Sequence, residues 1–184
     1  MSQHLWRWLL LLILAVGLFL VGCDSKQRDP FPELSWDDLM PPDWDPNDQF
    51  DGFEEAEELA DEDPRAQELF RELQHILDDA PVVDALDGKA VRLPGFVLPL
   101  AEHGEGGVTE FLLVPYFGAC VHVPPPPANQ IIHVVAPEDA PWPGGLFDSV
   151  WVRGILQVTP FQTHLGRAGY RIKDAQITRY EETD

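Results

Sequence analysis

Cys120 and His122 combine residue types and a spacing that could do chemistry. A thiol and an imidazole stand two positions apart in the stretch LVPYFGACVHVPPPPANQ (113–130). On a strand, residues i and i+2 point to the same face and lie about 6–7 Å apart. That distance exceeds the hydrogen-bond reach that a nucleophile and its general base need. The pair therefore does not indicate covalent catalysis, and we expect a protein that is not an enzyme.

The same pair is better suited to holding a metal ion. His133 falls on the next expected strand, so Cys120, His122 and His133 could form a soft three-ligand site for zinc or copper. The specificity is low, because a Cys-x-His match is a two-residue coincidence and a second Cys pair is missing. The alternative is structural, with a small buried thiol and a hydrogen-bonded histidine at the end of the sheet. Both interpretations stay open from the sequence, with zinc as the cofactor to test.

A run of four prolines follows the pair: Pro124, Pro125, Pro126 and Pro127. Such a run predicts a rigid polyproline II segment without backbone donors. One interpretation is a docking ridge for an aromatic-lined partner surface, and the other, which we favour, is a stiff crossover that fixes the angle between two strands. Trp142, in the second rigid loop APWPGG, is either a partner contact or a lid on the core.

The N-terminus indicates export. Arg7 supplies a positive charge before the apolar run Leu9–Val21, which is shorter than the stretch of about 20 apolar residues that a membrane helix needs. The run closes in LVGC, which resembles a lipobox, the cleavage site of bacterial lipoprotein precursors. We therefore expect residues 1–22 to be a signal peptide and Cys23 to carry the lipid. The alternative is a retained N-terminal anchor, and in both cases the rest of the chain faces the periplasm.

Asp24 and the overall charge refine the expected location. An Asp directly after the lipidated Cys resembles an inner-membrane retention signal, so we favour the inner membrane over the outer membrane. The formal net charge is −20, with a sequence pI near 4.4. Nucleic acids are therefore excluded as partners, since neutralising phosphates requires clustered Lys and Arg. The charge also keeps the domain away from the membrane surface to which the lipid ties it.

Residues 23–63 are expected to be a tether and an acidic linker. Trp36 and Leu39 are spaced for a short docking helix near 36–40, which the two following prolines end. From Asp43 to Asp63 there are eleven acidic residues and no basic ones, which is typical of a solvated segment. A partial calcium-loop match lies inside this run, but it lacks the glycine that the loop requires.

The remaining residues, 64–180, are expected to form one domain of a helix and a β-barrel. Apolar residues recur at helical spacing in PRAQELFRELQHILDD, with Asp63 as N-cap and Pro64 at the first helical position. Strand-like segments follow at 87–100, 108–117, 129–136, 149–159 and 168–180. An imperfect alternation near Lys173 predicts a bulge in the last of them. The fold class is mainly β with one N-terminal helix (α+β), and the simplest architecture is a small OB-like five-stranded barrel, closed or partly open, with the helix packed against it.

Four segments resemble one known family. They are WDDL (36–39), DGKAVRLPGFVLPL (87–100), FLLVPYFGACVHVPPPPANQIIHV (111–134) and VWVRGIL (150–156). Together they resemble the bacterial family named domain of unknown function 3299, and the resemblance covers nearly all of 36–180 apart from the acidic run. It implies a small, exported, often lipid-anchored proteobacterial protein without an assigned activity. It also implies a link to transport, because some members are encoded beside ABC-type transporter components and metal-related periplasmic proteins.

Two functional hypotheses follow from these observations. The first is a periplasm-facing lipoprotein that acts as a non-enzymatic accessory or adaptor of an envelope (ABC-type) transport system. The second is a metal-binding or metallochaperone lipoprotein that uses the Cys-x-His site. The membrane, reached through the lipid, and a transporter component are the expected partners.

Replacing Cys23 tests the anchoring. We expect Cys23→Ser to leave an uncleaved or soluble precursor, because the lipid is attached through a thioether that a hydroxyl cannot form. Membrane fractionation and the electrophoretic mobility of the product measure this. Normal processing and membrane association of the variant would contradict lipidation at this residue.

Overall fold

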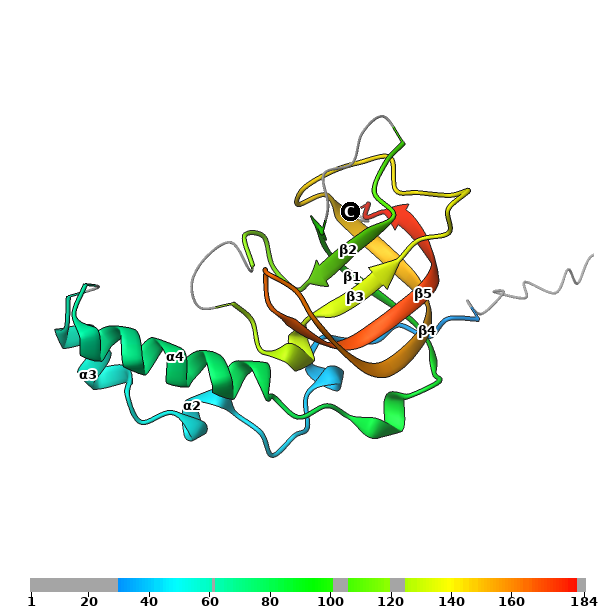
Figure 1. Ribbon diagram of the computed structural model, residues 1–184. Coiled ribbons are helices and arrows are strands. Elements are labelled where there is room, and N and C mark those ends of the chain that lie inside the picture. Colours follow the sequence, from blue (N-terminus) through cyan, green and yellow to red (C-terminus); the bar gives the residue numbers. More distant parts are fainter. Residues whose placement is uncertain (1–29, 61, 101–105, 120–124, 182–184) are drawn as a thin grey trace, which may run out of the picture. The chain divides into compact units, whose positions relative to one another are not determined.

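Five strands pair into a sheet that closes on itself as a ring (Figure 1). The computed structural model describes residues 30–60, 62–100, 106–119 and 125–181. The strands are β1 (Ala90–Pro99), β2 (Glu110–Val114), β3 (Ile132–Val135), β4 (Ser149–Gln162) and β5 (Arg167–Arg179). Around the ring they follow the order β1-β2-β3-β5-β4, and β4 pairs with β1 to complete it. β3 and β5 run parallel, whereas the other four pairs of neighbours are antiparallel.

β1 bends between the part that pairs with β4 and the part that pairs with β2. Its first part pairs with β4 through Ala90–Phe96, and its last part pairs with β2 through Phe96–Pro99. The bend follows Pro94 and Gly95. A Cβ at Gly95 would lie 2.9 Å from the carbonyl oxygen of Val114, so the strand can cross β2 this closely only with glycine.

A bulge lies where β4 and β5 pair. The register shifts between Arg153 and Ile155 of β4, and Asp174 on β5 has φ 50°. The extra residue on β5 lies opposite Gly154, where a side chain would run into Ile172. This is the position near Lys173 where the sequence predicts a bulge, and the local bend helps the two longest strands curl around the ring.

The ring interior is filled by side chains that alternate along each strand. Val91, Leu93 and Val97 of β1 point inward, and β2 contributes Phe111 and Leu113. A second apolar cluster covers the outer face of β2 and β3; it contains Leu98, Leu112, Val114, Ala119, Ile131 and Ala168. β2 is therefore buried on both faces, which is why its sequence is a continuous apolar run rather than an alternating one.

Tyr170 of β5 connects the ring to the segments before and after α4. Its hydroxyl donates to the Leu39 carbonyl at 2.7 Å and accepts the Val83 N–H at 2.7 Å. Burial raises the pKa of Tyr170, so the phenol stays protonated and keeps its donor. Leu39 lies in the 3-10 turn η1 (Asp37–Leu39) and is fully buried in the ring core. Next to this turn, Trp36 Nε1 donates to the Pro94 carbonyl at 2.8 Å.

Within the described residues, three α-helices precede the ring. They are α2 (Pro46–Gln49), α3 (Phe53–Glu58) and α4 (Pro64–Asp78). The Asp63 carboxylate caps α4 by accepting the Arg65 N–H at 2.8 Å, and Pro64 occupies the first turn, as the sequence predicts. None of the helices among the described residues is long and apolar enough to span a membrane.

The acidic segment 43–63 differs from the expected solvated linker. It contains α2 and α3, and between them Phe50 is 4% exposed and packs against Leu69, Leu73 and Leu77 of α4. The physical reason is a set of apolar side chains hidden among the carboxylates, whose burial outweighs the solvation of their neighbours. The apolar face of α4 therefore packs on this segment, in a cluster separate from the ring interior, and not against the sheet as expected.

The mainly β class with a five-stranded sheet is confirmed by the ring. β2 and β3 are shorter than expected because 115–119 and the 3-10 turn η3 (Ala128–Gln130) leave the ladder. β4 is longer than expected and continues through Pro160, which falls within the second register shift against β5. A proline is tolerated at such a position because the ladder is already interrupted there.

Removing the Tyr170 hydroxyl should destabilise the ring. Tyr170→Phe leaves the Leu39 carbonyl and the Val83 N–H without this partner, and an unsatisfied buried group costs about 1–3 kcal/mol. Urea denaturation of the variant measures the loss. Tyr180→Phe is the matched control, because Tyr180 is 36% exposed and its variant should be as stable as the wild type. Equal stability of both variants would show that the bridge contributes nothing.

Candidate functional site

The residues expected to hold a metal are only partly covered by the structure. Cys120, His122 and Pro124 lie outside the described residues, as do Cys23 and Asp24. The structure therefore does not test the lipidation, sorting and Cys-x-His assignments, which stay predictions. His133 is described, and its surroundings bear on the metal hypothesis.

His133 lies on the outer face of β3, yet it is only 1% exposed. Phe161 from the end of β4 stacks on the imidazole, with ring centroids 3.8 Å apart and planes at 6°. The Nε2 atom is 2.6 Å from the Glu110 carboxylate, and the Nδ1 atom accepts a hydrogen bond from Arg171 Nε at 2.9 Å. Both ring nitrogens of His133 are thus engaged by protein groups.

These contacts show that the imidazole of His133 is neutral. A guanidinium can only donate, so Nδ1 carries no proton and Nε2–H donates to Glu110. Burial lowers the pKa of His133 below its usual 6.5, and the charge of Arg171 lowers it further, whereas the hydrogen bond to Glu110 opposes both.

A metal ion at His133 would have to displace Glu110 or Arg171. Across the described parts of the chain, no three or more His, Cys, Asp or Glu side chains gather as metal ligands would. The arrangement matches the structural alternative for His133, a hydrogen-bonded buried histidine.

Trp142 and the described prolines are more buried than a docking ridge would be. Trp142 is 6% exposed, belongs to the ring core and pairs through its backbone with Val108. This burial favours the lid on the core over the partner contact, the two interpretations that the sequence leaves open. Pro126 is buried, while Pro125 and Pro127 are half-buried and lead directly into η3. This burial favours the stiff crossover over the docking ridge.

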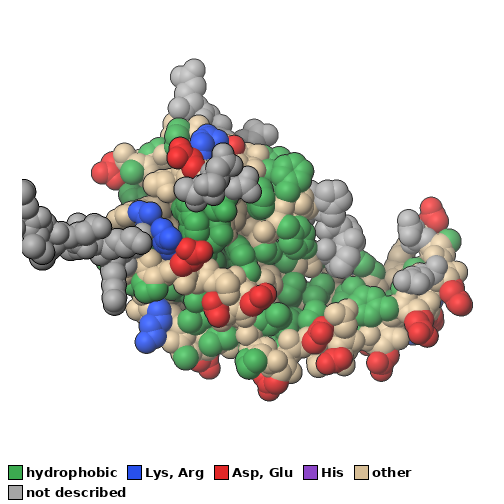
Figure 2. All heavy atoms as spheres, turned by 180° about the vertical axis from the view of Figure 1, so that it is seen from behind, with side chains coloured by type: hydrophobic (Ala, Val, Ile, Leu, Met, Phe, Trp, Pro, Cys, Tyr) green, Lys and Arg blue, Asp and Glu red, His purple; other side chains and the backbone are tan. Residues whose placement is uncertain are grey.

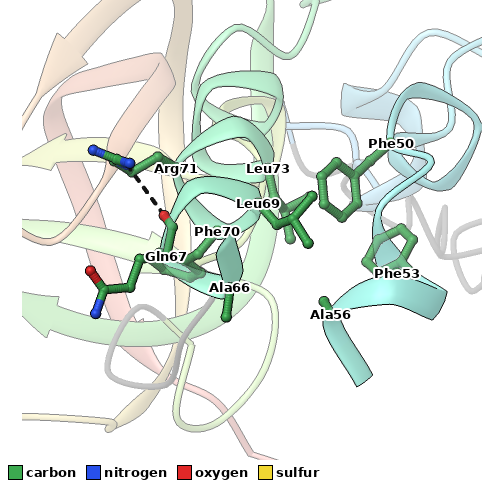
Figure 3. A pocket seen from close by; sticks show the side chains of 9 residues that line it. All are labelled: Phe50, Phe53, Ala56, Ala66, Gln67, Leu69, Phe70, Arg71 and Leu73. Atoms are coloured by element: carbon green, nitrogen blue, oxygen red, sulfur yellow. Dashed lines mark hydrogen bonds between the residues drawn. The ribbon is translucent and has the colours of Figure 1, made fainter. Parts of the chain in front are cut away.

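A groove between α3 and α4 is the feature best suited to binding. Its volume is about 530 Å³. The residues that line it are Phe50, Phe53, Ala56, Ala66, Gln67, Leu69, Phe70, Arg71 and Leu73 (Figure 3). This groove is not predicted from the acidic run, because so many carboxylates in sequence are typical of a solvated segment. The signal was present, since Phe50, Phe53, Ala56 and Leu59 recur every three positions within that run.

One wall of the groove is fixed and the other is exposed. Phe50 faces Leu69 and Leu73 of α4, and all three are buried (Figure 3). Phe53, the first residue of α3, meets Phe50 edge to face at 4.8 Å and remains 40% exposed. Phe53 is thus a large apolar side chain available at the mouth of the groove.

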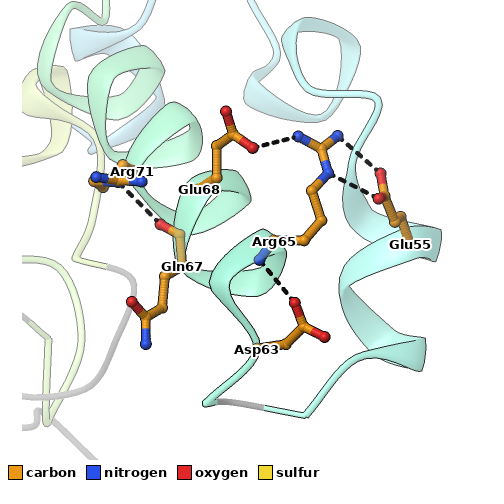
Figure 4. A network of polar contacts seen from close by, with 6 residues as sticks. All are labelled: Glu55, Asp63, Arg65, Gln67, Glu68 and Arg71. Carbon is orange, nitrogen blue, oxygen red and sulfur yellow. Dashed lines mark hydrogen bonds and ion pairs between the residues drawn. The ribbon is translucent and has the colours of Figure 1, made fainter.

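An arginine clamp holds α3 beside α4 (Figure 4). Arg65 Nε donates to Glu55 at 2.8 Å, a second guanidinium nitrogen donates to the same carboxylate at 3.0 Å, and a third donates to Glu68 at 3.0 Å. The bidentate bond to Arg65 lowers the pKa of Glu55, so the pair stays charged. The clamp is exposed, so it orients α3 more than it stabilises the fold.

The surroundings of the groove are acidic. Residues 43–79 contain fifteen Asp and Glu and two Arg. Figure 2 shows Asp and Glu side chains gathered around hydrophobic ones at the end formed by these helices. One of the two arginines, Arg65, is already paired with Glu55 and Glu68. The groove is therefore an apolar surface with a strongly negative rim.

The fold and the groove define a small, mainly β protein whose five-stranded ring carries an acidic helical segment with an apolar groove. A family model described as "Protein of unknown function (DUF3299)" matches residues 36–179. The chain belongs to the DUF3299 family, as the motifs of the sequence predict.

A solved structure supports the same assignment. The chain is similar to the crystal structure of a DUF3299 family protein from Pseudomonas aeruginosa PAO1, with 38% sequence identity and a TM-score of 0.63. The similarity covers 84% of this chain and 99% of that chain. No curated protein matches this chain.

The neutral state of His133 predicts how stability depends on pH. A histidine whose pKa is lowered on folding contributes stability above its unfolded value of 6.5, and this contribution is lost as the pH falls below 6.5. We expect the unfolding free energy in urea to fall between pH 7 and pH 5, before most carboxylates titrate. His133→Gln should flatten this part of the profile, whereas the exposed control variant His75→Gln should retain it. A profile that is unchanged in His133→Gln would refute the assignment.

Proposed function

We propose that this DUF3299 protein is a periplasm-facing lipoprotein that acts as a non-enzymatic accessory or adaptor of an envelope (ABC-type) transport system. Lipid on Cys23 would hold it at the inner membrane, and the groove between α3 and α4 would receive a protein component of the transporter. The link to transport rests on what the family resemblance implies. The role as a binding protein rests on the groove.

The observation that carries the proposal is an exposed apolar groove in a strongly charged setting. Fifteen acidic residues between 43 and 79 favour solvation of this segment, and yet Phe53 is left 40% exposed at the groove mouth. Large apolar patches rimmed by polar groups mark interaction sites, and aromatic side chains are enriched at the centres of interfaces. An adaptor needs such a surface and no reacting groups.

We also propose an OB-like architecture for the ring. The strand order β1-β2-β3-β5-β4, with β3 parallel to β5, supports it. In this view the ring is the scaffold, and the helical segment before it supplies the contact surface. Five-stranded barrels of this type serve widely as binding modules.

Crosslinking from the groove tests the proposed adaptor role. A photoreactive phenylalanine analogue placed at position 53 of the full-length chain should crosslink in cells to an ABC-type transporter component identified by mass spectrometry. The same analogue at Ile155 is the control, because Ile155 is 47% exposed but lies on β4. Crosslinks to a transporter component from both positions, or from neither, would overturn the proposal.

A further inference from the structure

The composition of the groove selects an apolar occupant. Seven of its nine lining residues are apolar, and Gln67 and Arg71 project from the side of α4 away from α3 (Figure 3). Arg71 Nε donates to the Gln67 carbonyl at 3.3 Å instead of pointing between the helices. A polar small molecule would lose its hydrogen bonds to water on the floor of this groove without replacing them.

The shape of the groove suits a helix. Its walls are two helices that lie side by side, α3 and α4, so a third helix can pack its side-chain ridge into the groove between them. The volume of about 530 Å³ has room for the few apolar side chains that one helical face presents at positions i, i+3, i+4 and i+7. Each described strand also has a neighbour on both sides within the ring, so the sheet offers an extended peptide no edge that is free along a whole strand.

The negative charge around the groove favours a positively charged occupant. Glu54 follows the exposed Phe53, Glu72 precedes Leu73, and both carboxylate side chains are exposed. With Arg65 paired to Glu55 and Glu68, the field around the groove is negative. It repels anionic lipids and fatty acid carboxylates, and it attracts a cationic partner from a distance. A second copy of this chain, with its net charge of −20, is repelled as well.

We infer that the groove binds a short amphipathic helix of a partner protein, whose apolar face enters between α3 and α4 and whose flanking Lys and Arg face the acidic rim. This inference rests on the proposed adaptor function and specifies the chemistry of the partner segment. Phe53 and Phe70 contact the apolar face, and Glu54 and Glu72 set the preference for positive charge.

Designed peptides of about 18 residues test the inference. One peptide has Leu at the i, i+3, i+4 and i+7 positions and Lys elsewhere; a second has Glu in place of Lys; a third has the composition of the first in an order without an apolar face. Fluorescence anisotropy with the folded mature chain measures binding. We expect only the amphipathic Lys peptide to bind, and to bind more weakly as salt rises from about 50 to 500 mM.

Matched variants locate the binding. Phe53→Asp should weaken binding of the Lys peptide by at least about tenfold. It should fold normally, because Phe53 is 40% exposed and an acidic residue suits the first position of a helix. Ile155→Asp, which changes an equally exposed apolar residue on the ring, should change binding less than about twofold.

Charge reversal checks the role of the rim. In the double variant Glu54→Lys and Glu72→Lys, we expect the preference to move toward the Glu peptide. Equal binding of the Lys peptide and the scrambled peptide, or equal loss in Phe53→Asp and Ile155→Asp, would overturn the inference. Self-association of the wild type that Phe53→Asp abolishes would also overturn it, in favour of a second copy as occupant.

The two proposals fail separately. Crosslinking of Phe53 to a transporter component without Lys-peptide binding would leave the adaptor role standing and remove the basic helix. Specific Lys-peptide binding without such a crosslink would keep the basic helix and remove the transporter as the partner.

Discussion

Closure of the ring depends on the parallel pairing of β3 with β5. This junction spans three residue pairs, fewer than any other in the ring. It is reinforced on both faces by side chains of consecutive β5 residues. Inside, Tyr170 bridges to Leu39 and Val83; outside, Arg171 holds His133. A short ladder with evenly spaced but slanted bonds is thereby stabilised by polar contacts that are themselves shielded from water.

The apolar clusters of residues 31–184 have different structural roles. The ring interior contains the largest of these clusters and fixes the strand register. The cluster of Phe50 with Leu69, Leu73 and Leu77 is smaller and holds the helical segment together. Because this second cluster is separate, substitutions that alter the groove can leave the ring intact. A binding surface on such a segment can change without endangering the fold.

The sequence predicts regular elements well where one local signal dominates. α4 has a capping Asp63, a proline in its first turn and apolar residues at helical spacing, and its observed bounds follow from these signals. The bulge near Lys173 is predictable because the alternation breaks there. The family is predictable too, because the motif around residues 111–134 is long and specific.

Two features were not predicted from the sequence, because the sequence around the residues involved suggests a different environment from the one observed. Phe50 and Phe53 belong to an acidic run whose charge suggests solvation, and the helices form because Phe50 finds a partner face on α4. His133 occupies an outward position of a strand, where alternation predicts exposure or a ligand role. It is buried because Phe161, from a distant part of the chain, covers it. The stacking of Phe161 on His133 leaves no periodic signal in the sequence, unlike the apolar recurrence within the acidic run.

The bridge from Tyr170 to Leu39 also constrains the order of folding. The two residues are 131 positions apart, and the final strand must be in place before the N-terminal turn can be fixed. Contacts of this separation slow folding, since a long loop must close before they form. As the chain emerges N-terminus first during synthesis, the ring would therefore stay unfinished until the last strand had emerged, and the buried partners of Tyr170 would stay exposed to water until then.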